Sequence, residues 1–229
     1  MSCMAMPSKV IRFVLQPFAR PIRYGALKIM KKLRQPDDKR PVIATSGHIL
    51  EEIIIPSIFN FFREDKFREL ANFKKLPASE HDRIFNELEV AGICLSVLYL
   101  RVLKTLAKPE DYHFWQDVEI HLPKQLQRIL MGFGVAGSDA KLVRQLIDMR
   151  FDEYEKLIER VEFDIEIQKD LGSLAIETRW MAATTQAIAV GTVNHVRRGK
   201  IQEGDLLIQH VFRWLSSLQG KISRFRKKL

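Results

Sequence analysis

The stretch LEVAGICLSVLYLRVLKTL, residues 88–106, decides the fold. Apolar residues recur along it every three or four positions and cover most sides of the helix that this spacing predicts. A helix that is apolar on most sides belongs in the centre of a protein rather than on its surface. The sequence therefore predicts a central helix over residues 80–107.

The same spacing continues before and after this stretch, and strand signals are nearly absent. The further helices are expected over residues 46–56, 57–73, 110–121, 124–133, 139–170, 173–198 and 205–229. The glycine-rich residues 132–139 lack the Gly-Lys-Ser/Thr ending of a phosphate-binding loop and are expected to form a turn between helices. The predicted fold is an all-α bundle of about six to eight helices.

Serine and proline mark several of the expected helix boundaries. Ser46 and Ser138 stand where an N-cap is expected, and SEHD at residues 79–82 has the form of a capping box. Pro56 and Pro123 each predict a kink or the start of a new helix, because proline has no backbone N–H to donate. Small side chains over residues 181–191 would permit a close contact between two helices.

The last helix carries an apolar stripe that continues into a basic tail. The residues of this stripe recur at spacings close to a heptad and are Leu207, Val211, Trp214, Leu218, Ile222, Phe225 and Leu229. Its inner part is expected to pack on the body, with Ile222, Phe225 and Leu229 projecting beyond it. The seam could close within one chain or between two, so a homo-oligomer through this helix is one of two open alternatives. Gly199, which follows Arg197 and Arg198, is expected just after the end of the preceding helix.

The charge is concentrated at the two ends of the chain. The protein has 229 residues, of which 46% are hydrophobic, so it can bury a sizeable core. Its formal charge is +9; residues 1–41 carry +8 and residues 221–229 carry +5, which leaves −4 for the rest. We therefore expect a basic amphipathic N-terminal segment, residues 1–41, and one helical domain, residues 42–229, with a basic C-terminal tail. A body of that sign would not attract a polyanion, so contacts with anions should involve the ends.

Residues 21–35, PIRYGALKIMKKLRQ, show what these ends could bind. As a helix, this stretch has an aliphatic side and a side with five basic residues, which is the pattern of a membrane-surface helix. The C-terminal KISRFRKKL repeats the pattern. The expected partner is thus an anionic membrane surface or a protein. The candidate anion-binding residues are Lys9, Arg12, Arg20, Arg23, Lys28, Lys31, Lys32, Arg34, Lys221, Arg224, Arg226, Lys227 and Lys228.

Two other interpretations of the basic ends stay open. Basic residues interleaved with Phe13, Phe18 and Tyr24 could bind nucleic acid, although no nucleic-acid-binding module is recognisable. The scarcity of acidic residues before Asp37 also suits an organelle presequence, which would place the protein in the mitochondrial matrix or another organelle. The main expectation is an intracellular protein on the cytoplasmic face of a membrane. No transmembrane helix is expected, because the longest nearly uncharged run, residues 90–100, is about half of the roughly 20 residues that a bilayer requires.

The chemistry for an enzyme is sparse. His113, Asp117 and His121 lie four residues apart and therefore on one face of a helix, and they are the candidate metal ligands for an alternative interpretation as a helical metalloenzyme. The two histidines would be roughly 12 Å apart along the axis, too far for one ion. Arg150 and Tyr154 are expected on an exposed face with helix-spaced ion pairs.

No cofactor is expected, and the two cysteines, Cys3 and Cys94, offer neither a disulfide framework nor metal-ligand spacing. Cys94 lies within the apolar stretch and is expected in the core. The sequence thus favours a non-catalytic helical scaffold, adaptor or assembly factor at a membrane.

Overall fold

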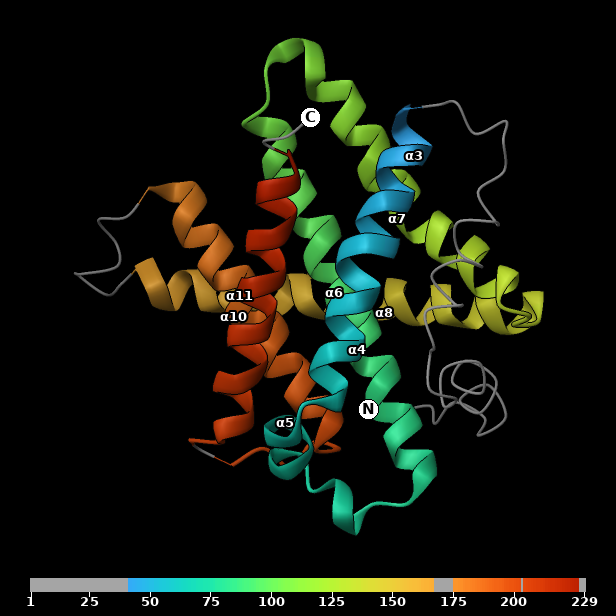
Figure 1. Cartoon of the computed structure of the whole chain (residues 1–229). Helices are drawn as coiled ribbons and strands as arrows, with labels where there is room; N and C mark the ends of the chain where they lie inside the picture. Colours follow the sequence, from blue (N-terminus) through green and yellow to red (C-terminus); the bar gives the residue numbers. More distant parts are fainter. Residues whose placement is uncertain (1–40, 167–174, 203, 227–229) are drawn as a thin grey trace.

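The computed structural model describes residues 41–166, 175–202 and 204–226. Within these ranges the chain forms helices and no strand, with seven α-helices if the three consecutive segments over 41–63 are counted as one (Figure 1). The expected all-α bundle is confirmed. The basic N-terminal segment lies outside the described residues.

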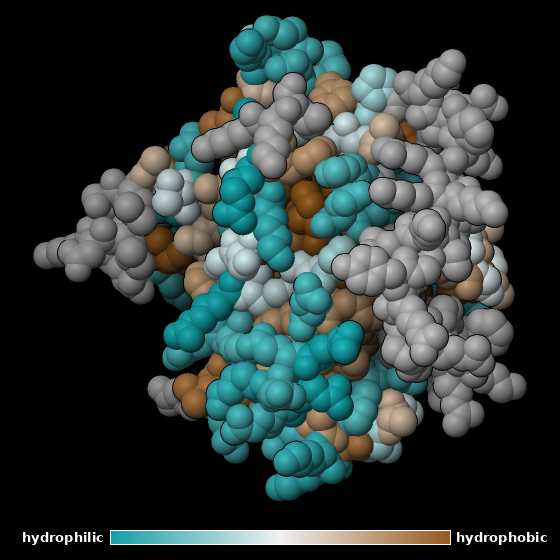
Figure 2. All heavy atoms as spheres, viewed as in Figure 1, coloured by the Kyte–Doolittle hydropathy of each residue, from teal (hydrophilic) through white to brown (hydrophobic). Residues whose placement is uncertain are grey.

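Helix α6 (Ala78–Thr105) is the centre of the bundle, as the sequence predicts. Every residue from 84 to 100 is buried, and Cys94 is completely enclosed. The helix packs against α7 (Tyr112–Gly132), α8 (Gly137–Glu166), α10 (Ile176–Val196) and α11 (Leu206–Arg226). Figure 1 shows α8 crossing behind α6 and α11, with α10 and α11 on one side and the first helix on the other. Hydrophilic residues cover most of the lower half of the same face in Figure 2.

The first described helix is continuous through three segments. It comprises α3 (Pro41–His48), the π-helical η1 (Ile49–Ile54) and α4 (Ile55–Arg63). Ser46 does not cap it, because Ser46 is buried inside α3 and its hydroxyl donates to the Val42 carbonyl at 2.8 Å. Pro56 does not interrupt it either. The wider turns of the π segment directly precede Pro56, at the place where its missing N–H leaves a carbonyl without an α-helical donor.

Helix 41–63 is the one helix in the described residues that is long and apolar enough to cross a membrane by length and composition. The expectation of no transmembrane helix is based on the longest nearly uncharged run, residues 90–100. That criterion overlooks helix 41–63, because two adjacent acidic residues, Glu51 and Glu52, interrupt the apolar sequence of this helix. Core helices of water-soluble proteins pass the same test, and Ile49, Leu50 and Ile54 are completely buried in the bundle. The length and composition of helix 41–63 are therefore not evidence that it spans a membrane.

The other predicted caps are also wrong. α6 begins at Ala78 and α8 at Gly137, which places Ser79 and Ser138 inside the first turns, and Pro77 at the start of α6 forms no side-chain cap. α7 continues through Pro123, whose buried neighbours Leu122 and Leu126 hold the helix against the core. The glycine-rich residues do form the expected turn between α7 and α8, where Gly134 adopts a φ of +86°. Short elements complete the fold: α5 (Asp65–Leu70), η2 (Phe73–Lys75) and η3 (Pro109–Asp111).

The small residues of α10 allow a close contact with α8. A Cβ atom built on Gly191 would lie 2.5 Å from Cε1 of Tyr154 and 3.2 Å from Cδ1 of Leu157. The Tyr154 ring thus occupies the space that any other residue at position 191 would need, and its hydroxyl lies 3.3 Å from that of Thr192. The expected close contact between helices is confirmed.

α11 packs its apolar stripe on the body almost to its end. Asp205 accepts a hydrogen bond from the Leu207 amide at 2.9 Å and caps the helix, and Leu207, Val211 and Leu218 are fully buried. Ile222 is also buried, with 1% of its surface exposed, and Phe225 stacks on the His48 ring. The expectation that Ile222 and Phe225 project beyond the body is wrong, because helix 41–63 extends alongside α11 and covers them. Leu229 lies outside the described residues.

Candidate functional site

Helix 41–63 and α11 lie side by side and run in opposite directions. Near the end of the first helix, Phe61 stacks on Trp214 in the middle of α11, with ring centroids 4.6 Å apart. Towards its start, His48 stacks on Phe225 with the same centroid separation. Residue numbers therefore fall along one helix as they rise along the other, which is the signature of an antiparallel pair.

This pairing brings the two ends of the described chain together. Pro41 and Arg226 lie at the same end of the bundle (Figure 1). In the sequence, the basic residues 1–40 come directly before Pro41, and residues 227–229 come directly after Arg226. Both basic segments are therefore attached to the same end of the body, which we call the basic end.

Three of the candidate anion-binding residues belong to the described part of the chain. Arg224 is exposed and Lys221 is half-buried, whereas Arg226 donates from Nη2 to the Leu106 carbonyl at 3.3 Å, at the C-terminus of α6. No carboxylate within the described residues forms an ion pair with any of the three. Leu106, beside Arg226, has 49% of its surface exposed. Within the described residues, the basic end thus combines positive charge that forms no ion pair with an exposed aliphatic side chain.

The remaining candidates of this set lie outside the described residues. They are Lys9, Arg12, Arg20, Arg23, Lys28, Lys31, Lys32, Arg34, Lys227 and Lys228.

The candidate metal ligands share one face of α7, as their spacing predicts, but they do not form a site. His113 and Asp117 are exposed, and Nδ1 of His121 lies 2.8 Å from the backbone carbonyl of Asp117, in the same helix. In the part of the chain that the structure describes, no group of three or more His, Cys, Asp and Glu side chains could hold a metal ion. A neighbouring pair of these side chains could bind a metal ion only with further ligands from another helix. The described residues provide no such group of ligands.

A partly buried ion-pair cluster joins α6, α8 and α10, and sequence reasoning missed it. Arg150 donates to both carboxylate oxygens of Glu87, at 2.8 and 3.1 Å, and to Glu153 at 3.3 Å. Glu153 in turn lies 3.0 Å from Nε2 of His195. Burial alone would lower the pKa of Arg150, but the hydrogen bond and the charge of Glu87 outweigh it and raise that pKa. The hydrogen bond from His195 lowers the pKa of Glu153 despite its burial.

The expectation of an exposed face around Arg150 and Tyr154 is therefore wrong. Tyr154 is completely buried, and Arg150 has 16% of its side chain exposed. Each group of the cluster pairs with another, so the arrangement holds three helices together.

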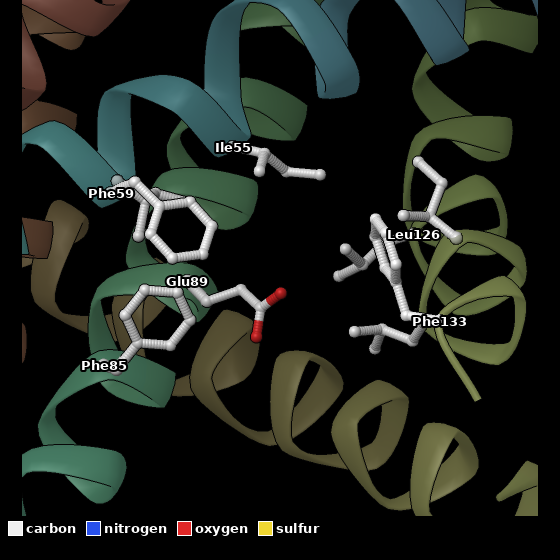
Figure 3. Close-up of a pocket in the computed structure, with 9 residues that line it drawn as sticks. Ile55, Phe59, Phe85, Glu89, Leu126 and Phe133 are labelled. Carbon is white, nitrogen blue, oxygen red and sulfur yellow. The ribbon is translucent and has the colours of Figure 1, made fainter. Parts of the chain in front are cut away.

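Among the described residues that line a pocket between α4, α6 and α7, Glu89 is the one ionisable side chain and the others are apolar (Figure 3). Its Oε2 atom is buried and has no hydrogen-bond partner in the described structure. Burial raises the pKa of the Glu89 carboxyl from 4.5 to about 7. Sequence reasoning passed over this residue, although a single glutamate between Leu88 and Val90 in the most apolar stretch is a visible signal.

Glu89 is expected to make stability depend on pH. Its pKa is higher in the folded state than in the unfolded chain, so the neutral carboxyl favours folding and this contribution is lost as the pH rises from 4.5 to about 7. The loss is on the order of 3 kcal/mol from this group. Glu89→Gln should remove that part of the pH dependence in urea unfolding measured between pH 5 and 8.

The matched control is Glu52→Gln, which removes an exposed carboxylate from the first helix. The control should keep the pH dependence of the wild type. An unchanged slope in Glu89→Gln would contradict the assignment.

The chain shows no significant match to a protein-family model, to a curated protein or to a solved structure.

Proposed function

We propose that the protein is a non-catalytic helical scaffold, adaptor or assembly factor that docks on an anionic membrane surface through its basic end. The observation that supports this most is the antiparallel pairing of helix 41–63 with α11, because it attaches two basic segments to one end of the body. Segments carrying +8 and +5 can then face one surface together.

Two weak membrane contacts on one rigid body reinforce each other. Each lysine or arginine near an anionic surface contributes on the order of 1 kcal/mol before screening. Once one segment is bound, the second is held close to the surface, so its binding is effectively intramolecular. Exposed aliphatic side chains such as Leu106 would add a contribution that salt does not screen.

Charge reversal separates this proposal from general electrostatic attraction. Lys221→Glu with Arg224→Glu should weaken sedimentation with vesicles containing phosphatidylserine by at least about tenfold, because four units of charge change at the basic end. Lys74→Glu with Lys75→Glu makes the same change on exposed residues of η2, at the opposite end of the bundle, and should have little effect. A chain that begins at Pro41 should also bind more weakly.

Two results would refute the proposal. One is the absence of binding to anionic vesicles at low salt. The other is an equal loss of binding from the variants at the two ends of the bundle. Tight binding of single-stranded RNA that is lost in the same variants, without vesicle binding, would favour the nucleic-acid alternative.

Pairing of two chains through α11 remains a less favoured proposal. The side chains of its seam, from Leu207 to Ile222, are buried within one chain. A second copy could contact them only after α11 separated from the body.

A further inference from the structure

The pocket around Glu89 has the composition of a ligand site. Its walls come from three helices, and eight of its nine lining residues are apolar: Ile55, Ile58, Phe59, Phe85, Leu126, Ile129, Leu130 and Phe133. Figure 3 shows the Glu89 carboxylate pointing into the space between Phe59 and Phe85 on one side and Leu126 and Phe133 on the other. Apolar walls with one converging polar group are typical of small-molecule sites.

The polar group of this pocket lacks what a buried carboxylate requires. A buried charge is normally paired with an opposite charge or with several N–H donors. α4 and α7 contribute only apolar side chains to the pocket, and α6 contributes Phe85 besides Glu89 itself. No titratable or charged group among the described lining residues therefore faces the carboxyl. Oε2 accepts no hydrogen bond from the described residues. Within the described residues, the geometry therefore leaves one anionic acceptor without a cation.

The pocket is small and is only partly enclosed by the residues that line it. Counted with the open solvent at its edge, the pocket has a volume of about 290 Å³, and its enclosed inner part is much smaller. The inner part thus has room for about one water molecule or one ammonium group. Phe133 follows the last residue of α7 and is the one described lining residue outside a helix.

We propose that this pocket binds the ammonium group of an alkylamine, with the nitrogen on the Glu89 carboxylate and the carbon chain against the apolar walls. An ammonium ion supplies both the missing positive charge and three N–H donors. Aromatic faces tolerate a cation better than aliphatic walls do, and Phe59 and Phe85 line the pocket with ring centroids 5.0 Å apart. An anionic ligand would be repelled, and a neutral alcohol would bring no charge.

The ammonium group could belong to a free amine or to a lysine side chain of another protein, and two probes distinguish these sources. Amide resonances of the full chain would be followed by NMR during titration with n-butylammonium, with n-butanol of the same shape, and with Nα-acetyl-lysine amide at pH 8. We expect n-butylammonium to bind at least about tenfold more tightly than n-butanol and to shift resonances of α4, α6 and α7. Binding should weaken about tenfold at pH 6, where a proton competes for the carboxyl.

Glu89→Gln should abolish the preference for the amine over the alcohol, and Glu52→Gln should leave it unchanged. Preference for the free amine over acetyl-lysine amide assigns the site to a small ligand, and the reverse order assigns it to a lysine of a protein partner. The proposal is overturned if neither amine saturates the pocket up to about 10 mM, at the weak end of specific affinities, or if n-butanol binds equally well. Vesicle binding does not depend on this outcome, so failure here and failure of the membrane proposal are separate results.

Discussion

Replacing Arg150 with alanine is expected to lower the free energy of unfolding by about 3–5 kcal/mol. The guanidinium donates two hydrogen bonds to Glu87, whose side chain has 7% of its surface exposed. Without Arg150 this carboxylate would stay buried with no positive charge beside it, and Glu153 would lose one of its two partners. Urea unfolding at pH 7, followed by circular dichroism, measures the change.

The matched control is Arg144→Ala, six residues earlier on α8. Arg144 pairs with Asp148, which has 59% of its side chain exposed, so its loss should cost about 0.5 kcal/mol or less. Replacing both members of the buried pair, as Glu87→Leu with Arg150→Leu, should recover most of the stability, because no charge is then left unpaired. Equal losses in Arg150→Ala and Arg144→Ala would show that the buried cluster contributes no more than a surface pair.

The core of this fold can be predicted from the sequence because the apolar residues that are buried recur with the period of a helix. The stretch 88–106 predicts a central helix, and α6 is buried on all sides from residue 84 to 100. The stripe from Leu207 to Leu218 predicts the packed face of α11. Gly199 adopts a φ of +77° after α10, as expected near a helix end, although the helix ends earlier than predicted, at Val196, and Arg198 takes the first left-handed position with a φ of +54°. Each of these signals depends only on neighbours within one helix.

The failed predictions depend on geometry between segments. A serine caps a helix only when it directly precedes the first helical residue. α6 and α8 begin one residue before Ser79 and Ser138, so these serines lie inside the first turns. Glu87 and Arg150 are separated by 63 residues, so no local spacing connects them. Pro41 and Arg226 lie at the same end of the bundle because two helices that are distant in the sequence pack antiparallel. The pattern within either helix does not indicate this direction of packing.

Replacing Gly191 with leucine is expected to lower the free energy of unfolding by more than about 3 kcal/mol, at or beyond the upper end of the range for overpacked cores. The first added atom alone would lie 2.5 Å from Cε1 and 2.9 Å from Cδ1 of the Tyr154 ring. Tyr154 is completely buried, so its ring has no solvent-filled space into which to move. α8 and α10 would have to separate along their contact. Thermal and urea unfolding measure the loss.

Gly191→Ala keeps this prediction measurable if the leucine variant does not fold, with an expected loss of about 1–3 kcal/mol. Gly220→Ala on α11 is the control: the nearest atom to its added Cβ is 3.9 Å away, so it should be neutral or stabilising by up to about 1 kcal/mol, as alanine is in a helix. Tyr154→Leu in the Gly191→Ala background should cost less than in the wild type, since the smaller side chain makes room for the new methyl group. Additive losses in that cycle would instead mean that the two residues do not constrain each other, and that the close approach of α8 and α10 depends on other contacts.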